Sequence, residues 1–206
     1  MDKREFKDSV YSEISNLVKA LSNSHRIEIL DLLAHGEKTV DAISKETSLT
    51  FANASQHLQH LKKNRLVKTR RDKNHVHYEL SNQYVYAIWK ALREFSRYQI
   101  PEIDNYVSKY QQTRNIKSAS YRDLEKYQPY ILLDVRPEKE FRTYHIDGAI
   151  HMNVRDLHQS LDSLDKTKTI ITYCRGPFCS LADDASEILQ QNGFRTFKLK
   201  ESAIDI

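Results

Sequence analysis

The two cysteines of the chain lie five positions apart in one short stretch, Cys174-Arg175-Gly176-Pro177-Phe178-Cys179-Ser180. The apolar run 168–173 before it is typical of a buried strand, and the residues after it have helical spacing. A loop from a strand into a helix points backbone N–H groups, and the positive end of the helix dipole, at its first side chain. We therefore expect Cys174 to have a lowered pKa and to act as a nucleophile, with Arg175 as a second stabilising group and Gly176 permitting the curl. The alternative is a buried structural cysteine.

Short polar side chains between residues 50 and 60 form a second group suited to recognition. Ala54, Leu58 and Leu61 recur at helical spacing, so the polar residues between them occupy the other faces. Asn and Gln pair with adenine edges in the major groove of DNA. We expect DNA contacts from five residues of this segment: Thr50, Asn53, Ser55, Gln56 and His57.

A basic segment follows that helix directly. Residues 62–73 contain seven Lys and Arg against a single Asp. Alternating apolar residues on either side of the turn at 72–74 predict a hairpin. We expect this hairpin to lie over the DNA backbone or minor groove, with contacts from Arg70, Arg71, Lys73 and His75.

The elements that position these residues follow in a set order. Helical spacing recurs at 14–21 and 27–33, and Thr39 and Thr50 are each placed to cap a helix. A helix, a short helix, a turn, a polar-faced helix and a basic hairpin together describe a winged helix-turn-helix.

Residues 20–33, ALSNSHRIEILDLL, resemble the opening of the ArsR family of dimeric bacterial repressors, and 50–61, 66–67 and 72–80 continue the match. The resemblance implies a homodimer on a palindromic double-stranded DNA operator. It also implies that the long helical stretch 82–112, with its aromatic stripe, builds the dimer interface. We expect Pro101 to break or restart this helix.

That family usually senses metals or metalloids through clusters of Cys, His or Asp. Here Thr39-Val40-Asp41 stands where its arsenic and cadmium sensors often place a cysteine pair, and residues 1–173 contain no cysteine. Soft metals require thiolates, so metal sensing by the first half is disfavoured. His75 and His77 share a strand face, where we expect phosphate contacts. We predict no metal site and no cofactor.

The second half has a different pattern. Apolar runs at 130–135, 168–173 and 196–199, with a helix between the last two, predict an α/β domain with a parallel sheet. Three motifs in order, LDVRP at 133–137, EF at 140–141 and HIDGAI at 145–150, resemble the rhodanese domain. This resemblance implies that Cys174 takes a sulfane sulfur as a persulfide and passes it to a thiol or cyanide. It further implies that backbone amides of 175–180, including Phe178 and Ser180, cradle the outer sulfur or an anionic donor such as thiosulfate.

Three features depart from the rhodanese pattern. Pro177 removes one N–H from the cradle, and Lys200-Glu201-Ser202-Ala203 replaces the usual Gly-Gly turn. The final helix and tail typical of the family do not follow, so the domain resembles a rhodanese shortened at its C-terminus. Asp134 and Arg136 match the family motif, and we expect them to be mainly structural.

Cys179 has no place in ordinary rhodanese chemistry. A second thiol is able to attack a persulfide on Cys174, which gives a disulfide or a bridge of several sulfurs. It is also a candidate ligand for arsenite or a soft metal, although two thiolates fill such a site poorly. The third reading is a small apolar residue at the helix–sheet interface.

Composition and charge limit the class of protein. Residues 1–117 carry 20 Lys and Arg against 14 Asp and Glu, whereas 118–206 carry 12 against 14, so the basic excess lies in the first part. A concentrated positive charge favours a polyanionic partner. No apolar run reaches the roughly 18 residues of a membrane span, and the charged N-terminus is unlike a signal peptide. Two cysteines exclude a disulfide-stapled secreted scaffold, so we expect a cytoplasmic protein with no membrane partner.

The sequence thus predicts an α+β multidomain protein. We expect a winged helix-turn-helix with its dimerisation helices at 1–112, a linker at 113–119 and a rhodanese-like α/β domain at 120–206. The combination suggests a transcriptional regulator, by analogy a repressor, that senses sulfide, persulfide or a low-molecular-weight thiol persulfide through Cys174. Three alternatives stay open: a sulfurtransferase tethered to DNA, an arsenic-responsive repressor, and a repressor whose second domain only docks or dimerises.

Overall fold

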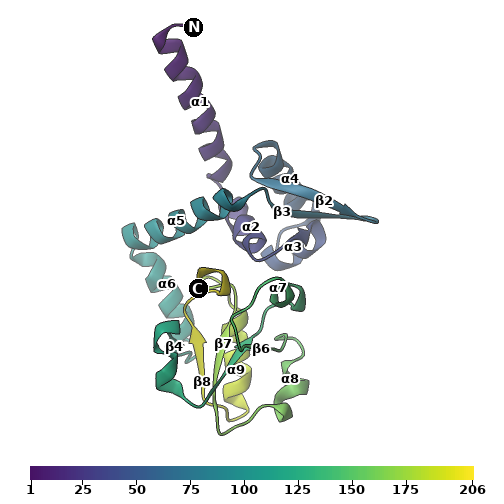
Figure 1. The fold of residues 1–206 in the computed structure, drawn as a ribbon, viewed down its shortest axis with the longest axis vertical. Helices are drawn as coiled ribbons and strands as arrows, with labels where there is room; N and C mark the ends of the chain where they lie inside the picture. Colours follow the sequence, from purple (N-terminus) through teal and green to yellow (C-terminus); the bar gives the residue numbers. More distant parts are fainter. The chain divides into compact units, whose positions relative to one another are not determined.

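The computed structural model describes residues 1–206, which divide into two compact units, Met1–Phe95 and Ser96–Ile206 (Figure 1). Helix α5 (Gln83–Gln99) crosses the division. No helix is both long enough and apolar enough to cross a membrane.

The first unit combines helices with a small antiparallel sheet. Its helices are α1 (Lys3–Leu21), α2 (Ser24–Ala34), α3 (Val40–Thr47), α4 (Phe51–Lys63) and most of α5, and its strands, in the order β1-β3-β2, are β1 (Lys38–Thr39), β2 (Val67–Asp72) and β3 (His75–Leu80). As expected, Thr39 caps α3 and Thr50 caps α4 through their hydroxyl oxygens. The apolar stripes of α2, α3 and α4 meet in one core that includes Ile29, Ile43 and Leu58, each fully buried.

The hairpin is in the predicted place. Strands β2 and β3 pair from Val67 opposite Leu80 to Asp72 opposite His75, which leaves Lys73 and Asn74 as a two-residue turn. Lys73 has φ 51°, and such left-handed backbone is the conformation that tight hairpin turns require. The first unit is therefore a winged helix-turn-helix, with α4 as its recognition helix.

The second unit is an α/β domain built on a five-stranded parallel sheet of order β4-β8-β7-β5-β6. The strands are β4 (Ser118–Ala119), β5 (Tyr130–Asp134), β6 (Ile150–His151), β7 (Thr169–Tyr173) and β8 (Thr196–Leu199). The helices are α6 (Glu102–Gln112), α7 (Glu138–Thr143), α8 (Leu157–Ser160) and α9 (Leu181–Gln191), with 3-10 turns η1 (Tyr121–Tyr127), η2 (Leu161–Ser163) and η3 (Ala203–Asp205).

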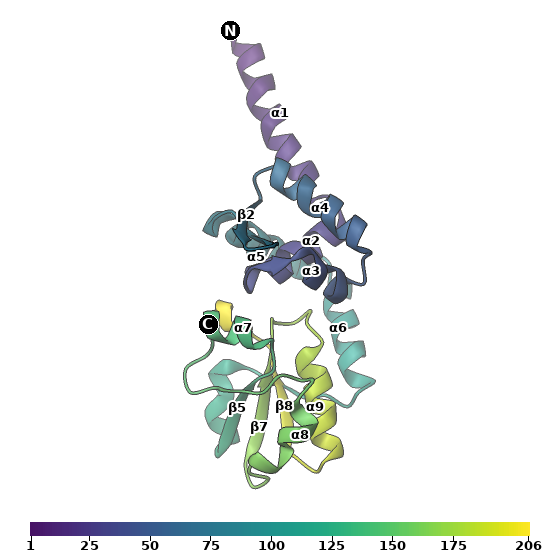
Figure 2. The ribbon, with the colours of Figure 1, turned by 90° about the vertical axis from the view of Figure 1, so that its right-hand side faces the viewer.

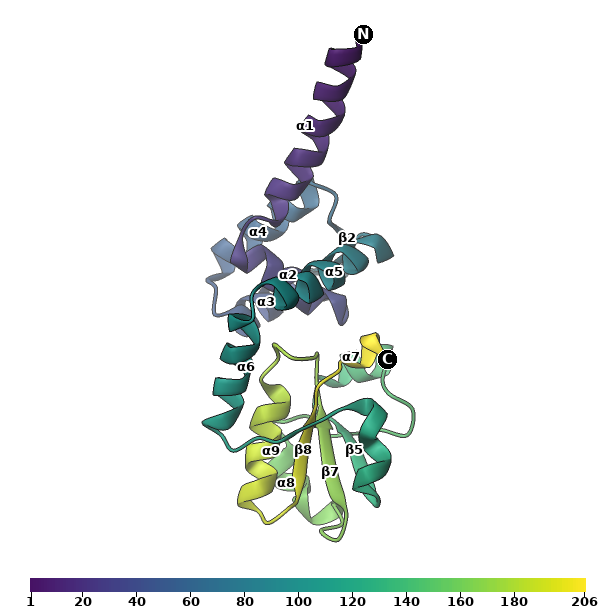
Figure 3. The same ribbon diagram turned by 90° about the vertical axis from the view of Figure 1, so that its left-hand side faces the viewer.

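Each face of this sheet is covered (Figures 2 and 3). Side chains alternate along β7, so Ile170 enters the core beneath α8 and α9, while Ile171 enters the core beneath η1. Ala203 of η3 is fully buried in the same core as Ile171, beneath η1. The segment Ala203–Asp205 thus contributes apolar surface to this core.

The stretch 113–119, expected as a linker, is packed into the second unit. Arg114 forms an ion pair with Asp184 of α9, Ile116 is buried, and Ser118–Ala119 is strand β4. Helix α6 also belongs to the second unit, although we expected it in the DNA-binding part. The polar composition of this stretch concealed the ion pair and the edge-strand pairing that fix it.

The break at Pro101 is confirmed. Helix α5 ends at Gln99, α6 begins at Glu102, and an ion pair from Arg97 to Asp104 at 2.6 Å joins the two helix ends.

Candidate functional site

The cysteine loop lies between β7 and α9, as the sequence predicted. Cys174 follows the last residue of β7, and the chain curls through Gly176 at φ 112°, which an L side chain rarely adopts. The Cys179 N–H donates to the Gly176 carbonyl oxygen at 3.3 Å, and Cys174 Sγ lies 3.4 Å from the Cys179 carbonyl oxygen. The loop therefore folds back so that its two cysteines are neighbours.

The two free thiols lie in unequal environments. Cys174 is 1% exposed, and burial, followed by the hydrogen bond to Cys179 and the charge there, raises the pKa of its thiol well above the usual value. Cys179 is half-buried, and the hydrogen bond from Cys174 lowers its pKa to about 7. Burial opposes this shift, whereas the charge of Arg175 and the backbone N–H groups of Arg175 and Leu181 support it.

This corrects the expectation for Cys174. Burial is the largest cause at Cys174 and raises the pKa of its thiol, although Lys198 and the Ala182 N–H of α9 act in the opposite direction. The charge of Arg175 and the backbone N–H groups of Arg175 and Leu181 favour a lower pKa at Cys179. The sequence identified both cysteines as candidates. It did not show which of the two thiols is buried, because burial depends on the packing of α9 on the sheet.

Two buried ion pairs hold the loop. The Arg175 guanidinium donates to both oxygens of Glu140 on α7, at 2.9 and 2.5 Å. Lys198 of β8 is 2% exposed, and its Nζ donates to Asp183 Oδ2 at 2.6 Å and to the Cys179 carbonyl oxygen at 2.8 Å. Sequence reasoning missed Glu140, Asp183 and Lys198 as site residues. One sequence signal could have indicated Lys198 as a site residue: it is a lysine within the predicted buried strand 196–199.

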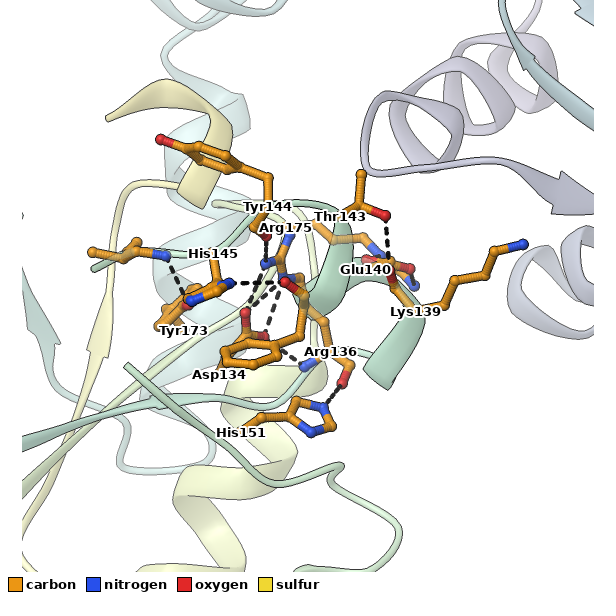
Figure 4. A network of polar contacts seen from close by, with 12 residues as sticks. Asp134, Arg136, Lys139, Glu140, Thr143, Tyr144, His145, His151, Tyr173 and Arg175 are labelled. Atoms are coloured by element: carbon orange, nitrogen blue, oxygen red, sulfur yellow. Dashed lines mark hydrogen bonds and ion pairs between the residues drawn. The ribbon is translucent and has the colours of Figure 1, made fainter. Parts of the chain in front are cut away.

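Asp134 and Arg136 belong to a buried network of polar contacts that is drawn together with Glu140 and Arg175 in Figure 4. The Arg136 guanidinium donates to Asp134 Oδ2 at 2.6 Å and to the Tyr144 carbonyl oxygen at 2.7 Å. The backbone N–H of Ile146 donates to the hydroxyl oxygen of Tyr173, whose pKa is raised chiefly by burial. These contacts join the chain after β5 to the end of β7. They are consistent with the structural role expected for the motif.

A pocket of about 470 Å³ opens beside the loop, within the second unit. Phe178, Cys179 and Ser180 line one side, and Tyr106 and Tyr110 of α6 line another. Its size lies within the range of small-molecule sites. Cys179 is thus the cysteine that a ligand in this pocket meets, while Cys174 lies buried behind it.

The residues expected to contact DNA differ in their exposure to solvent. Asn53 and Gln56 are exposed on α4, and Arg71, Lys73 and His75 are exposed on the wing. Ser55 and His57 are half-buried, and burial, followed by the positive charge of neighbouring groups, lowers the pKa of His57.

Two of the expected contacts already have partners. The Thr50 hydroxyl oxygen accepts from the Asn53 N–H at 3.2 Å, which is its capping bond. Arg70 is exposed, but its guanidinium donates to both oxygens of Glu37, at 3.0 and 2.6 Å. Arg71 is therefore the better candidate for a phosphate contact on this strand.

Both halves of the chain match known families. Residues 23–69 match the family described as bacterial regulatory protein, arsR family, and residues 117–202 match the rhodanese-like domain. The fold and the loop thus define a DNA-binding winged helix-turn-helix protein with a rhodanese-like domain.

The chain is similar to the following curated proteins and solved structure. The HTH-type transcriptional regulator Rv0324 of Mycobacterium tuberculosis is 29% identical over 97% of this chain and 89% of its own length. The arsenical resistance operon repressor of Staphylococcus aureus is 39% identical over 35% of this chain and 69% of its own length. A solution structure of a homodimeric winged helix-turn-helix DNA-binding domain from Mycobacterium bovis, 31% identical, covers 48% of this chain and 91% of that chain at a TM-score of 0.45.

The chain belongs to the ArsR family of bacterial regulatory proteins. It is a DNA-binding transcriptional regulator that carries a C-terminal rhodanese-like domain.

Proposed function

We propose that this regulator is a repressor whose rhodanese-like domain senses sulfane sulfur through Cys179 and Cys174 together. The observation that carries the proposal is the thiol pair: half-buried Cys179 lines a pocket, and the buried thiol of Cys174 lies 3.4 Å from the Cys179 carbonyl oxygen. The lowered pKa of Cys179 supports it. A thiolate with a pKa near 7 is a competent nucleophile at neutral pH.

The chemistry is a transfer followed by an exchange. The Cys179 thiolate attacks the outer sulfur of an alkyl persulfide, the donor S–S bond breaks, and the alkyl thiolate leaves with the electron pair. Cys179 then carries a persulfide. Cys174 loses its proton and attacks the Cys179 sulfur, HS⁻ leaves, and a Cys174–Cys179 disulfide remains. This order assigns the first attack to Cys179 and the resolving role to Cys174, the reverse of the roles implied by the rhodanese resemblance.

The proposed DNA partner is a double-stranded operator. Helix α4 presents exposed Asn53 and Gln56 for base edges, and the wing presents exposed Arg71 and Lys73 for phosphate. The positive excess of residues 1–117 supports the same partner.

We further propose a homodimer. Helix α1 exposes Phe6, Val10, Ile14 and Leu17 at intervals of four, four and three residues, which places them in one stripe. Exposed apolar surface of this kind is typical of a protein interface. The partner we propose is a second copy of the chain, paired through this stripe and through α5, which belongs to the stretch 82–112 that the ArsR resemblance places in the interface.

Regulation requires that the sulfur state of the loop changes DNA affinity. A hundredfold change needs only about 2.7 kcal/mol of difference between two states of the dimer. Helix α6 lines the pocket and follows α5 directly in the chain, so it is the element we expect to report the state of the loop.

The test is operator binding with and without a persulfide donor, combined with intact mass of wild type, Cys174→Ser and Cys179→Ser. The sensor predicts weaker DNA binding by the wild type after modification, a stable persulfide on Cys174→Ser, and no sulfur gain on Cys179→Ser. Sulfur gain with unchanged DNA binding would instead support a tethered sulfurtransferase. Persistent regulation in both variants would support a docking module, and release by arsenite that needs both cysteines would support an arsenic-responsive repressor.

A further inference from the structure

The pocket beside Cys179 has an unusual charge balance for a site that handles small sulfur anions. Among its lining residues, Lys198 is the one cation, and its Nζ is paired with Asp183 at 2.6 Å. Arg175, next to the loop, donates to both oxygens of Glu140. With a thiolate at Cys179, the lining is therefore net negative.

Asp183 is a lining residue that also carries an unsatisfied acceptor oxygen. The residue is 1% exposed, and Lys198 takes its Oδ2, whereas its Oδ1 is buried without a hydrogen-bond partner. A buried carboxylate oxygen without a donor is costly, and most such groups in proteins are paired. The missing component is a hydrogen-bond donor, and a positively charged one suits this oxygen best.

The remaining walls are aromatic. Tyr106, Tyr110 and Phe178 all line the pocket and are 72%, 43% and 42% exposed. The faces of aromatic rings attract cations. Tyr110 already accepts one such contact, since the Arg114 guanidinium lies 4.8 Å from its ring centre. That arginine is paired with Asp184, so it does not reverse the charge of the pocket.

From these contacts we infer that the sulfur donor is an alkyl persulfide bearing a primary ammonium group, the persulfide of a small aminothiol. The ammonium group binds among the aromatic rings and donates to Asp183 Oδ1, and the outer sulfur meets Cys179. The inference rests on the proposed function and specifies its donor. It also argues against thiosulfate, whose two negative charges would meet the thiolate and the carboxylate with no unpaired cation among the lining residues.

Three donors that share two carbons after the sulfur test the inference on the wild-type protein: the persulfides of cysteamine, ethanethiol and 3-mercaptopropionate, which are cationic, neutral and anionic. The readout is the single-turnover rate at which the reduced protein disappears by intact mass, because the persulfide on Cys179 goes on to the disulfide. Each rate is divided by the rate of the same donor with glutathione, which removes differences in intrinsic reactivity. We expect the cationic donor to exceed the neutral one at least about tenfold, equivalent to about 1.4 kcal/mol, and the anionic donor to be slowest.

Variants locate the selectivity. Tyr110→Ala removes an aromatic wall and should bring the cationic and neutral rates together, whereas Tyr121→Ala, an exposed tyrosine outside the pocket, should leave their ratio unchanged. Asp183→Asn alone would leave Lys198 buried without its carboxylate, which endangers folding. The double variant Asp183→Asn, Lys198→Met removes both charges, and it should also abolish the preference.

The outcomes separate the two levels of proposal. Equal normalised rates for the three donors, or a fastest anionic donor, would overturn the aminothiol inference and leave sulfur sensing standing. Failure of every donor to modify the protein would overturn both. A preference that survives Tyr110→Ala and the double variant would show that the selectivity arises outside this pocket and would also overturn the inference.

Discussion

The pKa of the Cys179 thiol is lowered to about 7, whereas an unperturbed cysteine loses its proton in alkaline solution. The largest cause is a hydrogen bond from Cys174, so the two thiols have to be considered together. Removing the donor should therefore be visible as a titration shift.

We predict that Cys174→Ala raises the pH midpoint for alkylation of Cys179 above its wild-type position near 7. The sign follows from the lost hydrogen bond, which favours the thiolate, so its removal favours the thiol. The measurement is the rate of iodoacetamide labelling against pH, followed by peptide mass. Cys179→Ser is the control and should show no group that labels with a midpoint near neutrality. An unchanged midpoint in Cys174→Ala would contradict the hydrogen bond from Cys174 as the cause of the lowered pKa.

Residue spacing was enough to identify the loop, because a strand, a cysteine-rich turn and a helix succeed each other in the sequence. It was not enough to rank the thiols. Whether Cys174 or Cys179 is buried depends on contacts with β8 and α9, and the Lys198–Asp183 pair beneath the loop joins residues 15 positions apart. Such partners leave no local pattern.

At the scale of the element, the wing offers two neighbouring arginines with different contacts. Arg71 is exposed, while Arg70 is held by Glu37. We predict that Arg71→Ala weakens operator and non-specific binding alike and reduces the salt slope by about one, as expected for a single phosphate contact. The measurement is DNA affinity over a series of salt concentrations.

Arg70→Ala is the matched comparison, and it should change that slope less, because this guanidinium is already neutralised within the protein. Equal slopes for Arg71→Ala and the wild type would remove Arg71 from the phosphate contacts.

Helix α4 is the element that we expect to carry the sequence preference. We predict that Asn53→Ala and Gln56→Ala each weaken binding to the operator by about 1–3 kcal/mol, with little effect on unrelated DNA. Both side chains are exposed, so the free energy of unfolding should stay near that of the wild type. Competition binding with operator and scrambled duplexes provides the measurement. A uniform loss on both duplexes would assign these residues to the backbone instead.

The winged helix-turn-helix was predictable element by element, because its caps, apolar stripes and turn residues are local. The association of α6 with the second unit was not predictable from the sequence. Its faces are mostly polar, and its association with the second unit rests on contacts such as Ser118 with Gln111, and Arg114 with Asp184, that the sequence does not mark.

At the scale of the whole molecule, the exposed stripe of α1 predicts the state of assembly. We expect Ile14→Asp, which places a charge in the stripe, to shift the protein from dimer to monomer and to lower operator affinity with it. Sedimentation equilibrium gives the molecular mass, and circular dichroism checks that helices persist. Ser12→Asp, on another face of the same helix, is the control and should remain dimeric. A dimeric Ile14→Asp would refute this interface.

The buried pair of Arg175 with Glu140 has a consequence for how the two halves respond to dissolved salt. Mobile ions screen exposed charges strongly and enclosed ones weakly. The positive field that favours the Cys179 thiolate comes from an enclosed guanidinium, whereas attraction to DNA comes from arginines and lysines open to water. A rise in ionic strength would thus weaken the proposed operator binding while leaving the proposed sulfur chemistry almost unchanged. Under the proposed function, the fraction of operator bound would change with ionic strength and with the sulfur donor independently of each other.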